Sequence, residues 1–200
     1  MTIASFGSPV LFAIAATITP GGATTLATAS GARFGFRRSV PLMAGIALGL
    51  ATLAAAAAAG LAGLLLAAPS LQLAVKLVGS GYLIWLAAKV AAGGPPRKGA
   101  DRATPMSFLR GVWLLWLNPK GWAMTLGAAA SFAALTSGPA QLALLLGSAF
   151  GLAASLSLAL WCLAGLLVGR LLRTPRQWRI ANAVLASLLV ASIVPMWLEP

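Results

Sequence analysis

The chain has 200 residues, of which 60% are hydrophobic and 8% are charged, and its formal net charge is +12. A soluble domain carries roughly a quarter charged residues, so this composition excludes a water-soluble globular protein. It predicts an all-α integral membrane protein, because a spanning helix needs about 20 mostly apolar residues and about six such helices fill the chain.

The scarce polar residue types limit the chemistry. The sequence has no histidine, one cysteine (Cys162) and two acids, Asp101 and Glu199. Usual general acids and bases are therefore lacking, and we expect no enzyme, no catalytic residue, no metal site and no cofactor. The basic residues bracket apolar segments instead of forming a stripe with aromatic residues. This favours membrane lipid over nucleic acid as the partner of the positive charge.

Hydropathy predicts six spanning helices along the chain. Their expected ranges are Ser5–Thr28, Val40–Leu66, Leu71–Ala91, Phe108–Leu135, Ala140–Gly169 and Trp178–Leu198. The first has no Lys or Arg before it, so we interpret it as a retained helix and not as a signal peptide.

The first predicted helix is interrupted by Thr19, Pro20, Gly21 and Gly22, and hydroxyl residues such as Thr24 surround the interruption. Proline removes a backbone donor, and glycine adds conformational freedom. At about 1.5 Å per residue, Pro20 lies about 22 Å from Ser5, which is near the middle of a bilayer. The threonine hydroxyls could line a polar path or bond back to their own helix.

The connections between helices differ in charge. The first, third and fifth contain the basic residues, at Arg33, Arg37, Arg38, Arg97, Lys98, Arg102, Arg170, Arg173, Arg176 and Arg179, whereas the second and fourth contain none. Since positive loops stay in the cytoplasm, we expect a multi-pass protein of the bacterial inner membrane with both termini in the periplasm.

The fourth predicted helix has a second interruption, Asn118-Pro119-Lys120-Gly121. Lys120 lies about 15 Å from Arg110 along the helix, too deep to reach the interface easily. A cation in mid-membrane costs about 2.5–3.5 kcal/mol, and the spans contain no acid to pair with it. Its candidate partners are backbone carbonyls freed by the breaks, Asn118, water or a substrate anion.

Both interruptions fall in the first helix of a three-helix half. Halves with an odd number of helices have opposite orientations, so residues 1–92 and 108–200, joined by a loop at 93–107, form a 3+3 inverted repeat within one transmembrane domain spanning 1–200. Paired interruptions of this kind indicate the substrate site of a secondary transporter. The simpler interpretation is two proline kinks between packed helices. The pairs Gly45/Gly49, Gly147/Gly151 and Gly165/Gly169 are interpreted as close helix packing.

Four segments resemble the lysine and homoserine/threonine exporter family (LysE/RhtB type). They are Thr-Pro-Gly-Gly at 19–22, Ser-Gly-Ala-Arg-Phe-Gly-Phe-Arg-Arg-Ser at 30–39, Lys-Leu-Val-Gly-Ser-Gly-Tyr-Leu-Ile-Trp-Leu at 76–86 and Trp-Leu-Asn-Pro-Lys at 116–120. The resemblance implies an exporter of amino acids or related metabolites driven by an ion gradient. In that family Thr-Pro-Gly is usually followed by Pro and then Asn or Asp, whereas this chain has Gly22 and Ala23.

The sequence thus predicts an inner-membrane exporter of amino acids or related small metabolites. The expected substrate site lies at the two interruptions, and comprises Thr19, Pro20, Gly21, Gly22, Thr24, Asn118, Pro119 and Lys120. The alternatives are an exporter of another solute or of a metal ion, and a membrane assembly subunit without transport activity. A homodimer is one candidate for the assembly, which the sequence leaves open.

Overall fold

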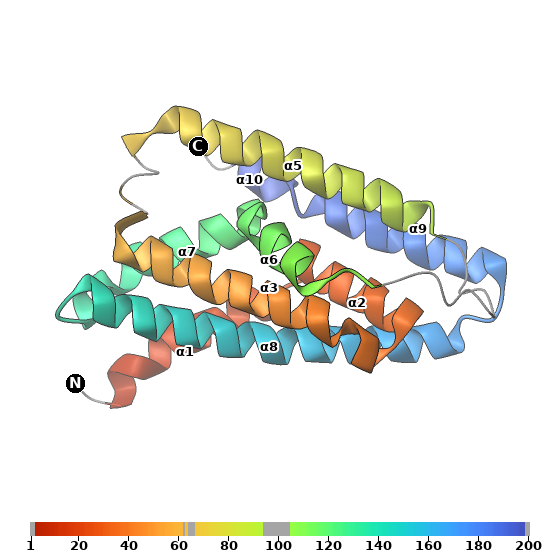
Figure 1. The fold of residues 1–200 in the computed structure, drawn as a ribbon, viewed down its shortest axis with the longest axis horizontal. Coiled ribbons are helices and arrows are strands. Elements are labelled where there is room, and N and C mark those ends of the chain that lie inside the picture. The colour runs from red at the N-terminus through yellow and green to blue at the C-terminus, as the bar shows by residue number, and fades with distance from the viewer. Residues whose placement is uncertain (1–2, 62, 64–66, 94–104, 199–200) are drawn as a thin grey trace.

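The computed structural model describes residues 3–61, 63, 67–93 and 105–198. This part of the chain is helical and contains no β-strand. The elements in chain order are α1 (Ile3–Ile18), α2 (Gly22–Phe34), α3 (Phe36–Ala56), the π-helical turn η1 (Ala57–Leu61), α5 (Pro69–Ala91), α6 (Phe108–Trp116), α7 (Pro119–Phe132), the 3-10 turn η2 (Ala133–Leu135), α8 (Pro139–Leu171), α9 (Pro175–Ala191) and α10 (Val194–Leu198). They lie roughly along one direction, as an elongated bundle (Figure 1).

All six predicted segments contain helix, and the fold is that of an all-α membrane protein. In the described residues, three helices are long and apolar enough to cross a membrane: Phe36–Leu61, Pro69–Ala91 and Pro139–Leu171. The pair Gly7–Ile18 and Gly22–Phe34 makes a fourth if it is counted as one bent span. The other predicted spans are built from shorter helices, so six crossings and an inverted repeat stay predictions.

The predicted first connection was placed wrongly. The first helix was expected to end at Thr28 and the second to begin at Val40, but α2 continues to Phe34 and α3 starts at Phe36. A single residue, Gly35, joins them, and its φ of +77° is a conformation that glycine adopts without strain. Arg33, Arg37 and Arg38 therefore lie in the ends of these two helices and not in a loop. From a terminal helical turn, a long basic side chain can still reach the membrane interface.

The predicted third loop, 93–107, falls mostly on residues outside the described ranges. Its last residues, 105–107, precede α6, and the Ser107 side chain accepts a hydrogen bond from the Arg110 backbone N–H. The predicted end of the second helix, Leu66, also lies outside the described residues.

Glycines bring four helices into backbone contact. A Cβ atom added at Gly45 of α3 would lie 2.0 Å from the carbonyl oxygen of Phe108 in α6, which is a collision, and one at Gly49 would lie 3.0 Å from that of Val112, which is a tight contact. Gly165 and Gly169 of α8 approach α2 in the same way, at the carbonyls of Thr28 and Ala32. Gly147 and Gly151 pack against Ala51 of α3. The predicted role of the three glycine pairs is confirmed. Small residues are required here because lipid supplies no hydrophobic drive for helices to associate.

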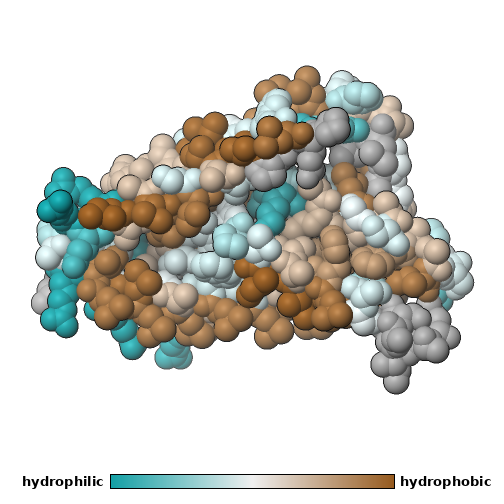
Figure 2. Space-filling model, turned by 180° about the vertical axis from the view of Figure 1, so that it is seen from behind, coloured by the Kyte–Doolittle hydropathy of each residue, from teal (hydrophilic) through white to brown (hydrophobic). Residues whose placement is uncertain are grey.

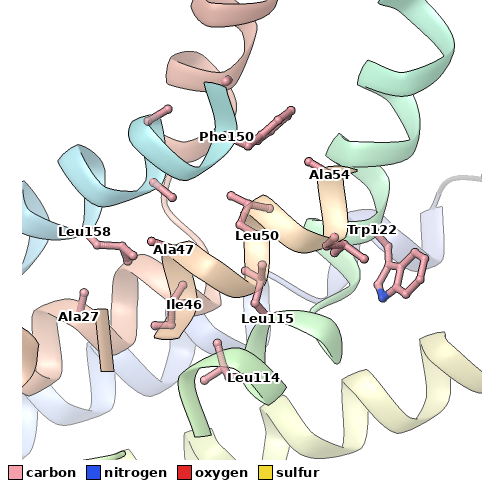
Figure 3. Packing of buried hydrophobic residues seen from close by; sticks show 14 of the residues in the cluster. Ala27, Ile46, Ala47, Leu50, Ala54, Leu114, Leu115, Trp122, Phe150 and Leu158 are labelled. Carbon is pink, nitrogen blue, oxygen red and sulfur yellow. The ribbon is translucent and has the colours of Figure 1, made fainter. Parts of the chain in front are cut away.

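The buried apolar cluster is centred on α3. Figure 3 shows Ile46, Ala47 and Leu50 of α3 with Leu158 of α8 and Leu115 of α6 on either side. All five side chains are buried. This cluster lies directly beside the two interrupted helices and supports their positions.

Helices α5 and α9 form a separate pair along one side of the bundle (Figure 1). Each makes its most extensive described contact with the other, whereas α3 and α8 share the largest contact in the rest of the molecule. The structure thus consists of a tightly packed group and a more loosely attached helix pair.

One end of the molecule is basic. There α2 ends, α3 begins, α5 and α8 end, and α9 begins (Figure 1). The hydrophilic surface gathers at this end in Figure 2, and most of the remaining surface is apolar. The start of α1 and the end of α10 lie toward the opposite end (Figure 1). Apart from Lys76 near the start of α5 and Lys120 at the second break, the described basic residues therefore lie toward one end of the bundle, as loops on one side of a membrane require.

Candidate site at the two helix breaks

The first break separates α1 from α2, whose axes differ by 57° in direction. Pro20 has no N–H to continue α1, and the backbone of Gly21 is extended, with φ of −175°. Thr24 turns back to this residue: its Oγ1 accepts a hydrogen bond of 2.8 Å from the Gly21 N–H. Gly21 supplies no side-chain cap to the first turn of α2. The N-terminus of α2, which carries the positive end of the helix dipole, therefore lies uncapped at the break.

The second break separates α6 from α7. Asn118 is the N-cap of α7, and its Oδ1 accepts a hydrogen bond of 3.1 Å from the backbone N–H of Lys120. Pro119 is the first helical residue, where its fixed φ favours the helix and its missing N–H costs nothing. Trp122 Nε1 donates to the Trp116 carbonyl at 2.7 Å. The end of α6 and the start of α7 are thus held together by side chains within the break.

Lys120 connects the two breaks. Its Nζ donates to the carbonyl oxygen of Thr19 at 2.8 Å and to that of Pro20 at 3.4 Å. The side chain is half-buried. The sequence left four kinds of partner open for this cation, and in the structure its partners are backbone carbonyls freed by the first break. These lie at the negative end of α1, which stabilises a positive charge.

Four successive carbonyls at the end of α1 receive side-chain donors from other helices. Ser157 Oγ of α8 donates to the Thr17 carbonyl at 2.7 Å, and Trp161 Nε1 donates to the Ile18 carbonyl at 3.1 Å. Lys120 supplies the donors for the next two. A helix leaves its last carbonyls without intrahelical partners, and here α7 and α8 provide the partners.

Ser157 and Trp161 were missed by the sequence interpretation. They lie one helical turn apart on α8, a spacing that places them on one face. Both are polar-tipped residues inside a long apolar helix, which is the only signal that the sequence offers for them.

Most of the predicted site residues gather around one small void. Its volume is about 30 Å³, more than the roughly 10–15 Å³ that a cavity needs to hold one water molecule. Its walls include six of the predicted residues: Thr19, Gly21, Gly22, Thr24, Asn118 and Lys120. Of the remaining two, Pro20 contributes a carbonyl to Lys120, and Pro119 starts α7. The structure thus brings the two interruptions together, as their matched positions predicted.

The threonine hydroxyls near the first break serve their own helices. Thr17 and Thr19 donate to the carbonyls of Ala13 and Ala15, four residues earlier, and Thr28 donates to Thr24. Of the two interpretations left open, these three residues follow the local one, in which the hydroxyl bonds back to the helix.

Gly22, the first residue of α2, packs against α5 and the second break. A Cβ atom there would lie 3.0 Å from Leu83 Cδ2 of α5 and 3.6 Å from Asn118 Nδ2. A Cβ atom on Gly79 of α5 would lie 2.3 Å from the carbonyl oxygen of Leu117 in the second break. Helix α5 therefore packs against both breaks, and at Gly79 the backbone of the break leaves no room for a side chain.

The main polar groups of the site are the Lys120 ammonium and the backbone carbonyls of the first break. Within the described ranges, no group of three or more His, Cys, Asp or Glu side chains could hold a metal ion. The arrangement can bind a carboxylate through Lys120 and the first turn of α2.

Comparison with known proteins gives a family match. The family model described as LysE type translocator matches residues 14–192. The "Cysteine/O-acetylserine efflux protein" of Escherichia coli (strain K12) is 29% identical over 173 residues, which cover 86% of this chain and 87% of that relative. The proteins of the same name from Escherichia coli O9:H4 (strain HS) and Shigella flexneri serotype 5b (strain 8401) match with the same identity and coverage. No solved structure matches.

Proposed function

The chain belongs to the LysE type translocator family, and on this premise we propose that it is a secondary transporter that exports an amino acid or a related small metabolite through the two helix breaks. The family and the matched relatives are exporters and not enzymes. A half-buried lysine that bridges two interrupted helices is the observation that carries the proposal.

Lys120 binds the carboxylate of the solute. In the structure its ammonium has neutral carbonyl partners. A carboxylate would add an opposite full charge and could accept the same hydrogen bonds. A carboxylate beside Gly21 would also meet the first turn of α2, which lacks a side-chain cap. A Cβ atom on Gly21 would lie 3.4 Å from Lys120 Nζ, so the two groups that favour an anion are adjacent.

Through the same lysine, solute binding is coupled to the contact between α7 and the end of α1. When Lys120 turns to the solute, the carbonyls of Thr19 and Pro20 lose their donor, and the contact between α7 and the end of α1 is released. The two half-helices can then separate. In a transporter built from two repeats, such a release permits one half to rock against the other and expose the site on the other side.

The proposal includes the membrane arrangement. One domain spans residues 1–200 as a 3+3 inverted repeat in the bacterial inner membrane, with both termini in the periplasm. The position of each break in the first predicted helix of its half supports the repeat. The basic end of the bundle, which lies away from the start of α1 and the end of α10, supports a cytoplasmic assignment for that end (Figure 1).

Flux into inverted inner-membrane vesicles tests the function. Labelled cysteine and O-acetylserine, the solutes in the names of the relatives, are the first probes. We expect energised vesicles with the wild-type chain to accumulate one of these or another small amino acid, and Lys120→Met to reduce the uptake about 10- to 150-fold, the cost of one charge-assisted hydrogen bond.

Arg176→Met is the control, because it removes one positive charge from an exposed side chain at the start of α9, which does not line the void at the breaks. It should leave the uptake near that of the wild type. Normal uptake by Lys120→Met at equal protein level would show that the lysine is not part of the site.

A further inference from the structure

A second, much larger cavity lies at the basic end of the bundle. Its volume is about 620 Å³, within the range of small-molecule sites in proteins. Helices α2, α3, α5, α6 and α9 form its walls. It shares no lining residue with the void at the breaks, although α2 lines both, with Thr24 at the void and Leu26 at the near end of the cavity. Arg33, at the basic end of the cavity, lies about 17 Å along α2 from Gly22 at 1.5 Å per residue.

The cavity walls carry positive charge from three helices. Arg33 lies in the last turn of α2, Lys89 in the last turn of α5, and Arg110 near the start of α6. The described lining residues include no aspartate or glutamate. Three cations in one cavity wall, without an acidic residue among the described lining residues, favour an anionic ligand and repel a cationic one.

Aromatic side chains form the apolar part of the wall. Tyr82 and Trp85 are stacked, with ring centroids 5.7 Å apart. Lys89 Nζ lies 5.3 Å from the centroid of the Trp85 ring, so its charge is held against an aromatic face. A ligand that fits this wall has an aromatic or other apolar part next to its negative group.

The polar end of the cavity is organised by backbone contacts. Asn182 of α9 is buried, and its Nδ2 donates to the carbonyl of Gly93, the residue at the end of the α5 segment. A Cβ atom on Gly93 would lie 3.5 Å from Nη1 of Arg33. The guanidinium is thus beside the junction of α5 and α9.

We propose that this cavity is a distinct binding site for small carboxylates with an aromatic or other apolar remainder, and that it rejects solutes of net positive charge. Its place in export rests on the proposed function: it receives the solute at the basic end before the carboxylate reaches Lys120. The chain would then select against lysine and arginine, because the cavity repels the extra ammonium or guanidinium group.

Binding of phenylacetate to the purified full-length protein tests the proposal. The protein is placed in nanodiscs of phosphatidylcholine, and labelled phenylacetate is measured by equilibrium dialysis, with phenethylamine and lysine as cationic competitors. We expect saturable phenylacetate binding that neither cation displaces. Arg110→Gln and Lys89→Gln should each weaken it about tenfold or more, as expected for loss of a charged hydrogen-bond partner.

Two variants serve as controls. Arg176→Gln removes an exposed charge at the start of α9, outside the cavity lining, and should leave binding unchanged. Arg110→Lys keeps the charge and should keep most of the binding, which separates loss of charge from loss of folding.

Lys120→Met distinguishes the two sites. Retained phenylacetate binding in this variant supports the cavity as a separate site. Loss of all binding in Lys120→Met, with unchanged binding in Arg110→Gln and Lys89→Gln, would overturn the proposal but leave the site at the breaks intact. Binding in the cavity without any export by the wild type would instead overturn the proposed function.

A lipid headgroup is the competing source of a negative charge at this end. The same dialysis in nanodiscs containing phosphatidylglycerol separates the two ligands. Unchanged phenylacetate binding supports the solute site, whereas complete displacement by phosphatidylglycerol would show that the cavity is a lipid site and overturn the proposal.

Discussion

At the scale of single residues, the second break determines where the Lys120 ammonium lies. Asn118 caps α7 and Pro119 starts it, so Lys120 occupies the first helical turn. Helical side chains lean toward the N-terminus of their helix, which directs this one past the end of α7 toward α1. A cation at the N-terminus of a helix is unfavourable, and the carbonyls at the end of α1 offset that cost.

Ser157 supports the same carbonyls, and its loss should be measurable. Ser157→Ala removes the donor to the buried Thr17 carbonyl, so we expect the free energy of unfolding to fall by about 1–3 kcal/mol. Thermal unfolding in detergent checks the change. Ser155 is two residues away on α8, is exposed and bonds back to the Gly151 carbonyl.

Ser155→Ala is therefore the matched control and should change stability by no more than about 0.5 kcal/mol. Equal effects of the two substitutions would show that the bond between Ser157 and α1 contributes nothing.

The sequence predicted the breaks but not their full surroundings. Proline and glycine act on their own backbone, so Pro20 and Pro119 could be recognised inside apolar runs without any tertiary knowledge. Ser157 and Trp161 could not be assigned to a face, because α8 is apolar on all sides and its periodicity is weak. Their role depends on which helix packs against them, which is a property of the fold.

At the scale of elements, glycine spacing sets which helices touch. The predicted close packing is seen for all three glycine pairs, since the absence of a side chain is visible in the sequence. The end of the first predicted helix was less predictable. The arginines near Gly35 were interpreted as part of a loop because they are charged, but α2 ends at Phe34 and α3 begins at Phe36, so only Gly35 separates the two helices.

Gly165→Ala should destabilise the contact between α8 and α2. Its Cβ atom would overlap the backbone carbonyl of Thr28, which cannot move like the end of a side chain. We expect a loss of about 1–3 kcal/mol, typical of overpacking. Unfolding in detergent, followed by circular dichroism, measures the loss.

Gly127→Ala of α7 is the corresponding control, since nothing lies within 4 Å of its added Cβ atom. It should stabilise α7 by up to about 1 kcal/mol through helix propensity. A destabilisation as large as that of Gly165→Ala would argue against backbone contact as the cause.

At the scale of the whole molecule, the division into a tight group and the α5–α9 pair was not predictable from hydropathy. All the spans are apolar, and the sequence does not say which pairs are close. The sorting of basic residues to one end was predictable, because each positive connection joins helices at the same end. The position of the basic residues is the basis for expecting this end in the cytoplasm and both termini in the periplasm.

Reporter fusions test that topology. A fusion after Leu198 should be active in the periplasm, because an even number of crossings returns the C-terminus to the side of the N-terminus. A fusion at Arg173, between α8 and α9, should report the cytoplasm and serves as the internal control. A cytoplasmic signal from the C-terminal fusion would contradict the six-helix arrangement.

The position proposed for Lys120, in the middle of the membrane, also has an electrical consequence. One elementary charge that crosses the full membrane potential changes in energy by about 2.3 kcal/mol per 100 mV. A bound anion cancels the lysine charge, whereas a zwitterion leaves the complex with one net positive charge. If the lysine moves through the field during export, the loaded step responds to voltage for a zwitterionic solute and is electrically silent for an anionic one. Measuring export at imposed diffusion potentials would therefore reveal the net charge of the transported species.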